Sequence, residues 1–193
     1  FSDKTDEEKT AIKRKFGTER AVLEAPQRIR RVCIDILKHY RERIQPNGFK
    51  AMIVTSSRRA AITYKDQLDE LESPECTVII SGDHNDEQIF WEYTDGTKQK
   101  KQIEDFKKPL GAGKDQSNLS ILIVKDMLLT GFDAPIAQVM YLDRKLTDHS
   151  LLQAIARVNR TNKNKFRGYI VDYFGLSDYL TEALEMFSTE DVE

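Results

Sequence analysis

The chain has 193 residues, of which 39% are hydrophobic and 32% charged, which suits one globular α/β domain with an appended helical segment. The net charge of −2 argues against a uniformly basic nucleic-acid-binding surface, and no apolar run approaches the roughly 18 residues of a membrane span. Cys33 and Cys76 lie far apart, so we expect no disulfide framework and a cytoplasmic location. Because the chain starts at Phe1 with charged residues, we expect a piece of a longer protein without a secretory signal.

The helices expected from the sequence begin with residues 1–25, a polar and helix-prone linker segment. A long amphipathic helix should follow, because apolar residues recur at helical spacing from Ile29 to Ile44. Pro46-Asn47-Gly48 then stops the pattern. By the same criteria, further helices are expected after the N-cap candidates Thr55-Ser56-Ser57 through Leu71, near 97–107, near 149–157 and from Leu176 to Phe187.

Five short apolar runs have the length of buried strands and alternate with these helices. They are residues 51–54, 77–80, 121–124, 137–142 and 168–171. This alternation predicts an α/β fold with an open, mostly parallel sheet and helices on both faces. We assign the domain to residues 26–175, with a polar, loop-rich stretch at 83–118 and a following helical segment at 176–193. Ligands of such sheets bind at the carboxyl ends of the strands, where we look for a site.

One candidate site follows the run at 121–124. The strand leads into Lys125-Asp126, and a loop with the sequence Thr-Gly-Phe-Asp-Ala-Pro follows at 130–135. Glycine at position 131 permits a positive φ and a close approach of the backbone to a ligand. Asp133 beside it can accept hydrogen bonds from hydroxyls or backbone amides. The alternative is that Gly131 only forms a turn and Asp133 only caps it.

A second candidate lies on the helix expected near 149–157. Gln153, Arg157 and Arg160 are spaced i, i+4 and i+7, which predicts one helix face rich in hydrogen-bond donors. Arginine pairs with phosphate oxygens through its fixed fork of N–H groups, so this face would suit a polyphosphate. The alternative is a solvated face with surface ion pairs, although no acid lies between Asp148 and Asp172.

Taken in this order, the two segments resemble motifs V and VI of superfamily 2 helicases and translocases. The residues that match the two motifs are Asp126, Gly131, Asp133, Gln153, Arg157 and Arg160. The residues that depart from them are Lys125, Thr130, Ala154, Ala156 and Asn159. Both arginines are kept, and guanidinium groups are the ones that contact phosphate.

A longer pattern is similar to the restriction (R) subunit of type I restriction-modification enzymes. It consists of residues 50–58, 128–135, 153–160 and 168–175, within a resemblance that covers about residues 25–187. The resemblance implies the second RecA-like lobe of an ATP-dependent double-stranded DNA translocase in a type I endonuclease. A first lobe of the same longer chain would bind most of the ATP and Mg²⁺, and modification and specificity subunits would be partners. Alone, this stretch is expected to be inactive, because it lacks Walker A, Walker B and nuclease motifs.

The resemblance also implies roles for individual residues. Arg160 would be the arginine finger, Arg157 its neighbour on the γ-phosphate, and Gln153 would orient the motif. Gly131 and Asp133 would line the nucleotide site, with Asp133 on the ribose or holding its own loop. Hydroxyls, strand-end amides and positive charge would bind the phosphates of the DNA backbone, and such contacts do not depend on the DNA sequence. The residues expected to do so are Thr55, Ser56, Ser57, Arg58 and Lys125.

Two other functions remain open from the sequence: a lobe of another superfamily 2 DNA or RNA helicase or remodeller, and a non-enzymatic α/β interaction module. The intact arginines argue against the second. Gly113-Lys114 resembles the end of a P-loop, but Lys108 and Asp115 stand where that motif requires Gly and Ser or Thr. The three histidines lack the spacing of metal ligands, so we expect no metal site.

Overall fold

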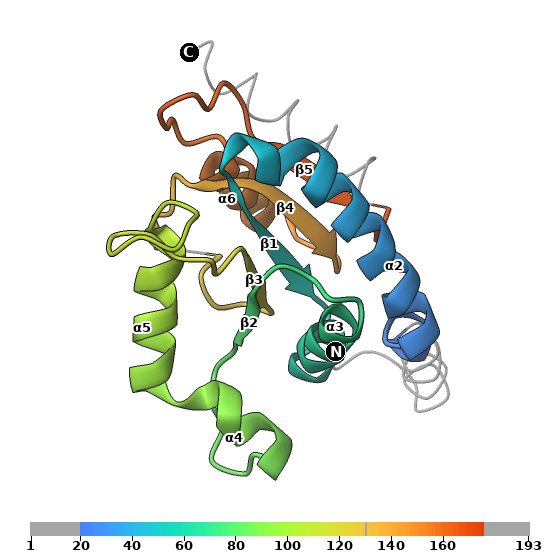
Figure 1. The fold of residues 1–193 in the computed structure, drawn as a ribbon. Helices are drawn as coiled ribbons and strands as arrows, with labels where there is room; N and C mark the ends of the chain where they lie inside the picture. Colours follow the sequence, from blue (N-terminus) through green and yellow to red (C-terminus); the bar gives the residue numbers. More distant parts are fainter. Residues whose placement is uncertain (1–19, 130, 176–193) are drawn as a thin grey trace, which may run out of the picture.

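The computed structural model describes residues 20–129 and 131–175, which contain a five-stranded sheet (Figure 1). All strand pairs are parallel, and the order across the sheet is β2-β3-β1-β4-β5. The strands are β1 (Lys50–Thr55), β2 (Cys76–Ile79), β3 (Ile121–Val124), β4 (Ala137–Asp143) and β5 (Tyr169–Asp172). The expected α/β fold is therefore confirmed. The helices expected within 1–19 and at 176–187 lie outside the described residues.

Helices cover both faces of the sheet, as the apolar strands require. They are α2 (Pro26–His39), α3 (Arg58–Glu70), α4 (Gln88–Thr94), α5 (Gly96–Lys107) and α6 (Asp148–Val158). α2 and α3 lie on one face, and α5 and α6 lie on the other, which is the arrangement that right-handed crossovers give this strand order (Figure 1). β1, at the centre, is buried along its whole length, with Met52 in register with Leu122 of β3 and Met140 of β4.

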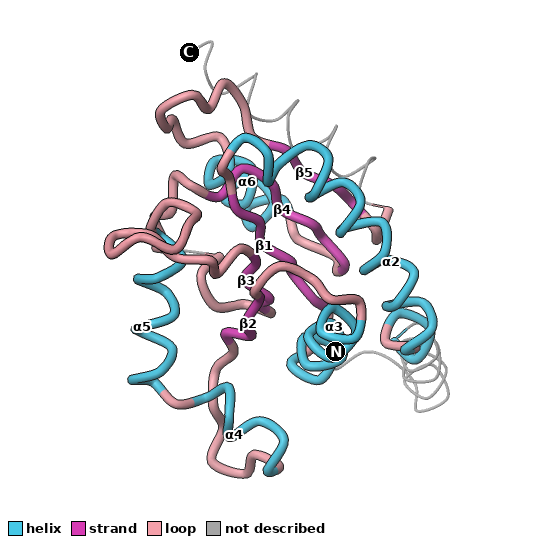
Figure 2. Tube along the Cα trace, in the orientation of Figure 1, coloured by secondary structure: helices cyan, strands magenta, loops and turns pink. Residues whose placement is uncertain are grey.

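Two helical segments differ from the expectation. α2 ends at His39, after which the chain continues as a π-helical turn at Tyr40–Ile44 and a 3-10 turn at Gln45–Asn47. Gly48 then stops the helix with a φ of 78°, a conformation that glycine adopts without strain. Within the stretch expected to be mostly loop, α4 adds a helix of 7 residues. The connection from α5 to β3 is loop, as expected (Figure 2).

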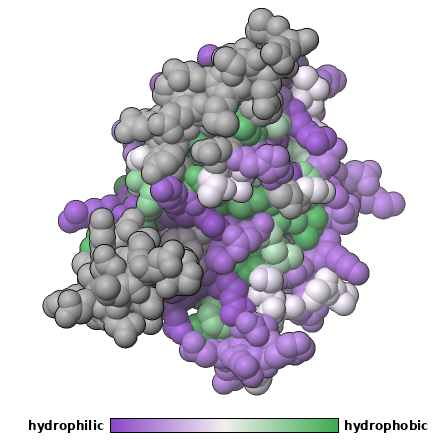
Figure 3. Space-filling model, turned by 180° about the vertical axis from the view of Figure 1, so that it is seen from behind, coloured by the Kyte–Doolittle hydropathy of each residue, from purple (hydrophilic) through white to green (hydrophobic). Residues whose placement is uncertain are grey.

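Most large hydrophobic side chains are buried in one cluster around the sheet. Among the described residues, the large hydrophobic side chains that remain exposed are Val22, Ile34, Ile89, Trp91 and Phe166. On the face seen from behind in Figure 3, hydrophilic residues separate the hydrophobic areas of the described surface. Scattered exposed hydrophobic residues are ordinary in folded proteins. Charged and polar side chains are therefore the better guide to a site.

A buried carboxylate ties three elements together at the end of β4. Asp143 is 2% exposed and accepts two hydrogen bonds from Arg28 of α2, at 2.8 and 2.7 Å. It also accepts a bond of 2.6 Å from the Tyr64 hydroxyl of α3. The hydrogen bonds that Arg28 donates to Asp143 raise the pKa of Arg28, and burial, followed by the Asp143 charge, raises the pKa of Tyr64. The network fixes both helices of one face to the carboxyl end of the sheet.

Lys50, the first residue of β1, is a buried cation. It is fully buried, and its Nζ donates to the Asp105 carbonyl at 3.3 Å and lies 5.4 Å from the Phe106 ring centre. Burial lowers its pKa to about 8. Below that pH both the folded and the unfolded chain carry the charge, and the fold bears the full cost of burying it. Between about pH 8 and the higher pKa of the unfolded chain, the unfolded state binds more protons, so stability contributed at this site rises with pH.

We therefore expect the Lys50→Met variant and the unsubstituted chain to differ in their response to pH. Between about pH 7.5 and about pH 9.5, the unsubstituted chain should gain about 1–2 kcal/mol of unfolding free energy relative to Lys50→Met. Urea denaturation of both proteins at each pH measures this difference. Lys100→Met, at an exposed position of α5, is the control. Parallel pH profiles for Lys50→Met and the unsubstituted chain would contradict the prediction.

Candidate functional site

The arginines of the second candidate segment line a cavity between α6 and the loop that follows β3. This cavity of about 180 Å³ is lined by Gly131, Gln153, Ala156, Arg157 and Arg160. The structure therefore brings together four residues that the sequence assigned to a nucleotide site. Gly131 has a φ of +67°, so its backbone conformation, rather than crowding, favours glycine here.

Arg157 is a buried guanidinium with unused donors. Its residue is 7% exposed, its Nη2 donates to the Leu129 carbonyl at 2.9 Å, and its guanidinium lies 5.6 Å from the Phe132 ring centre. Within the described residues, its Nε and Nη1 have no hydrogen-bond partner. Burial, followed by the charge of Arg160, lowers its pKa. Because buried donors are rarely left unsatisfied, these groups fit a site for an anionic ligand.

Arg160 has a different environment from the one that its spacing predicted. α6 ends at Val158, so Arg160 lies beyond the helix rather than on its face. Its Nη1 forms an ion pair of 3.1 Å with Asp133, and both side chains are more than half exposed, at 54% and 59%. An exposed pair of this kind is weak, and a phosphate can replace the carboxylate at little cost. Gln153 lies within hydrogen-bond distance of His149, at 3.0 Å.

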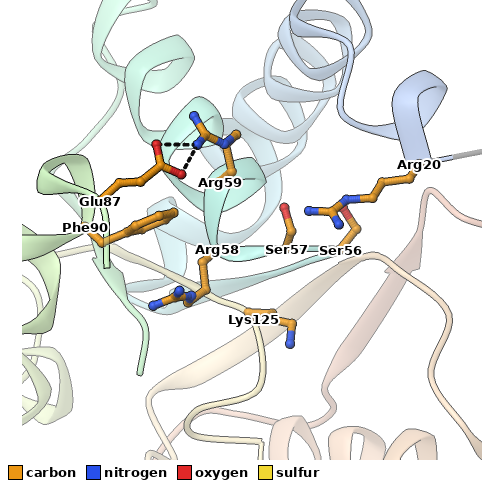
Figure 4. Close-up of a pocket in the computed structure, with 8 residues that line it drawn as sticks. All are labelled: Arg20, Ser56, Ser57, Arg58, Arg59, Glu87, Phe90 and Lys125. Carbon is orange, nitrogen blue, oxygen red and sulfur yellow. Dashed lines mark hydrogen bonds and ion pairs between the residues drawn. The ribbon is translucent and has the colours of Figure 1, made fainter. Parts of the chain in front are cut away.

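A second, open cavity of about 480 Å³ lies at the carboxyl end of β1 (Figure 4). It is lined by Arg20, Ser56, Ser57, Arg58, Arg59, Glu87, Phe90 and Lys125. Ser57 caps α3 as expected, because its hydroxyl accepts from the Ala60 amide at 3.0 Å. The Ser56 hydroxyl donates to Glu24 at 3.3 Å. Arg20 and Arg59 were missed in the sequence, although Arg59 directly follows a predicted contact residue.

The structure corrects the prediction that Thr55 contacts DNA. Thr55 is fully buried, and its hydroxyl lies 3.0 Å from the Ser57 carbonyl and 3.2 Å from the Val124 carbonyl. A phosphate cannot reach it, and its role is to join the ends of β1 and β3. The other four predicted contact residues all line the cavity.

The loop between β3 and β4 contributes to both cavities. Lys125 lines the cavity at the end of β1, and Gly131 lines the cavity beside α6. Lys125 also forms an ion pair of 2.6 Å with Asp126.

None of the helices within residues 20–129 and 131–175 has the length and the apolar composition that a membrane span requires.

The sheet and its covering helices define a class of fold, the RecA-like α/β domain. The helicase domain of Hef from Pyrococcus furiosus superposes with a TM-score of 0.50 at 15% identity, covering 78% of this chain and 27% of that one. A fragment of an HsdR subunit of a type I restriction enzyme from Vibrio vulnificus superposes with a TM-score of 0.61 at 19% identity, covering 84% and 30%. At such identities the likeness shows the fold alone.

Sequence similarity gives the family. Residues 81–175 match the family model for domain 3 of type I restriction enzyme subunit R. The MjaIXP endonuclease subunit of Methanocaldococcus jannaschii is 38% identical over 187 residues, which are 95% of this chain and 17% of that protein. The HindI endonuclease subunit of Haemophilus influenzae is 33% identical over 180 residues, which are 86% of this chain and 16% of that protein. The chain belongs with the R subunits of type I restriction enzymes and spans about a sixth of the length of these curated relatives.

Proposed function

We propose that this chain is the second motor lobe of an ATP-dependent double-stranded DNA translocase within a type I restriction endonuclease. The observation that supports this most directly is the pair of arginines beside Gly131, one of which has unsatisfied buried donors. A guanidinium in a buried, water-poor site stabilises developing phosphate charge more strongly than one in water. The proposal includes modification and specificity subunits as partners and a first lobe in the same longer chain.

In this proposal ATP and Mg²⁺ are bound mainly by the first lobe, and this lobe completes the site when the two close. The Mg²⁺ ion would neutralise charge on the phosphates. Arg157 is held by Leu129 and Phe132, and closure of the two lobes would have to bring its buried, unpaired N–H groups to the terminal phosphate. Arg160 exchanges Asp133 for a phosphate oxygen and acts as the more mobile partner. By itself this lobe would not hydrolyse ATP, since it supplies only these donors.

The cavity at the end of β1 is the proposed contact with the DNA backbone. Ser56, Ser57 and Lys125 line it, and hydroxyls and ammonium groups are common partners of backbone phosphates. Such contacts carry no sequence information, which suits a motor that moves along any DNA.

Replacing Arg160 with alanine in a full-length R subunit should lower DNA-stimulated ATP hydrolysis by about 10²-fold, since one charge-stabilising donor is removed. The expected size is moderate because Arg160 is exposed and already paired. Steady-state turnover at saturating ATP and DNA measures the effect. Lys163→Ala, at an exposed position outside the cavity, is the control and should keep full turnover. Unchanged turnover in Arg160→Ala would remove Arg160 from the nucleotide site.

A further inference from the structure

Every cationic side chain around the cavity at the end of β1 carries an acidic partner. The pairs are Arg20–Glu24 at 2.8 Å and Arg58–Asp86, Arg59–Glu87 and Lys125–Asp126 at 2.6 Å. A DNA phosphate that binds here must therefore replace a carboxylate. The cost of that exchange depends on how deeply each pair is buried, and the two neighbouring arginines of α3 differ in this respect.

Arg58 is fixed within the protein. Both of its terminal nitrogens bind the Asp86 carboxylate, whose side chain is 5% exposed, and its Nη1 also donates to the Ser81 carbonyl at 2.9 Å. The guanidinium lies 4.4 Å from the Phe90 ring centre. Asp86 is held in turn by the Asp83 amide at 2.8 Å, and the Arg58 hydrogen bond lowers the pKa of Asp86. Moving Arg58 onto a phosphate would leave a shielded carboxylate without its partner, which is costly.

Arg59, one residue later, forms an exposed pair. Its Nη2 donates to both oxygens of Glu87 at 2.6 and 2.8 Å, but the two side chains are 53% and 63% exposed. Figure 4 shows this pair near Phe90, with its two hydrogen bonds dashed. Water already solvates both groups, so exchanging Glu87 for a phosphate costs little. The guanidinium would exchange the carboxylate for another bidentate partner of equal charge.

We propose that Arg59, rather than Arg58, binds a DNA backbone phosphate, and that Glu87 competes with the DNA for it. Arg58 is instead a structural residue that holds the segment after β2 in place. Glu87 is the residue that precedes α4, so this segment, whose role the sequence did not explain, contributes an acid that limits the affinity of the lobe for DNA. The inference rests on the proposed function, since it assumes that this cavity meets DNA.

The test is the binding of a fluorescent double-stranded DNA of arbitrary sequence to a full-length R subunit, measured by anisotropy over a range of salt concentrations. Arg59→Gln should weaken binding several-fold and reduce the slope of log K against log salt by about 1, as expected for one lost phosphate contact. Glu87→Gln should tighten binding several-fold. In the double variant, Glu87→Gln should bring no gain, because the group that it frees is absent. Glu92→Gln, an exposed acid of α4, controls for the change in net charge.

The outcomes separate the inference from the proposed function. If Lys125→Gln weakens binding but Arg59→Gln changes neither affinity nor slope, the assignment of Arg59 is overturned and the DNA site stands. Equal gains from Glu87→Gln and Glu92→Gln would overturn the competition, since net charge alone would explain them. If the unsubstituted protein shows no salt-dependent DNA binding, the proposed function fails and the inference fails with it. Circular dichroism of each variant confirms that the fold is kept.

Discussion

Replacing Arg157 with methionine in a full-length R subunit is expected to lower kcat for ATP hydrolysis by about 10³-fold or more and to leave this lobe more stable. The loss of turnover follows from removing a guanidinium that is fixed in advance and shielded from water. The gain in stability follows from removing two buried donor nitrogens, Nε and Nη1, that have no partner among the described residues. We expect about 1 kcal/mol of additional unfolding free energy, because each unsatisfied donor carries a desolvation cost and methionine keeps much of the packing.

Two measurements on the same variant decide this prediction. Steady-state ATP hydrolysis with DNA gives kcat, and urea denaturation of the lobe gives the unfolding free energy. Arg167→Met, an exposed arginine that contacts Tyr169 outside the cavity, should change neither quantity appreciably. Loss of both turnover and stability in Arg157→Met would mean that the guanidinium is structural. Retained turnover would remove Arg157 from the nucleotide site.

The second large effect is expected at Asp143. Asp143→Ala should lower the unfolding free energy by about 3 kcal/mol or more, since breaking a buried ion pair leaves an uncompensated charge. Arg28 would lose both carboxylate oxygens and Tyr64 would lose its acceptor. Asp143 itself is 2% exposed, so solvent screens the present interaction little.

Urea denaturation of the chain measures the Asp143 effect, and Glu70→Ala is the matched control. Glu70 also pairs with an arginine, Arg30, at 2.7 Å, but the two side chains are 61% and 44% exposed. We expect Glu70→Ala to cost less than about 1 kcal/mol. Similar losses in the two variants would contradict the view that burial sets the size of these interactions.

The strands were predictable because the information for them is local. A run such as Ile121-Leu122-Ile123-Val124 is apolar at every position, which only a strand buried on both faces requires at that length. The N-cap at Ser57 was likewise predictable from the sequence, because a cap joins residues only three positions apart. The placement of Gln153 and Arg157 on one side of α6 was also predictable, because their spacing along a helix is local.

What the sequence did not reveal depends on contacts between distant residues. Nothing near Asp143 in the chain points to Arg28, which lies 115 positions away, or to Tyr64. Thr55 has the residue type of a phosphate contact, and only its burial between β1 and β3 excludes it. The spacing of Arg160 predicted a helix face, whereas the helix ends two residues earlier. Helix ends depend on tertiary packing as much as on local preference.

The connection from β3 to β4 touches both cavities with residues only six positions apart, Lys125 and Gly131. If the cavity beside α6 holds the nucleotide and the cavity at the end of β1 holds DNA, a shift of the backbone at Gly131 would reach Lys125 through only six residues. ATP hydrolysis and DNA binding would then be linked through the single connection between β3 and β4. A longer connection would separate these two events, giving an enzyme that hydrolyses ATP without translocating along DNA.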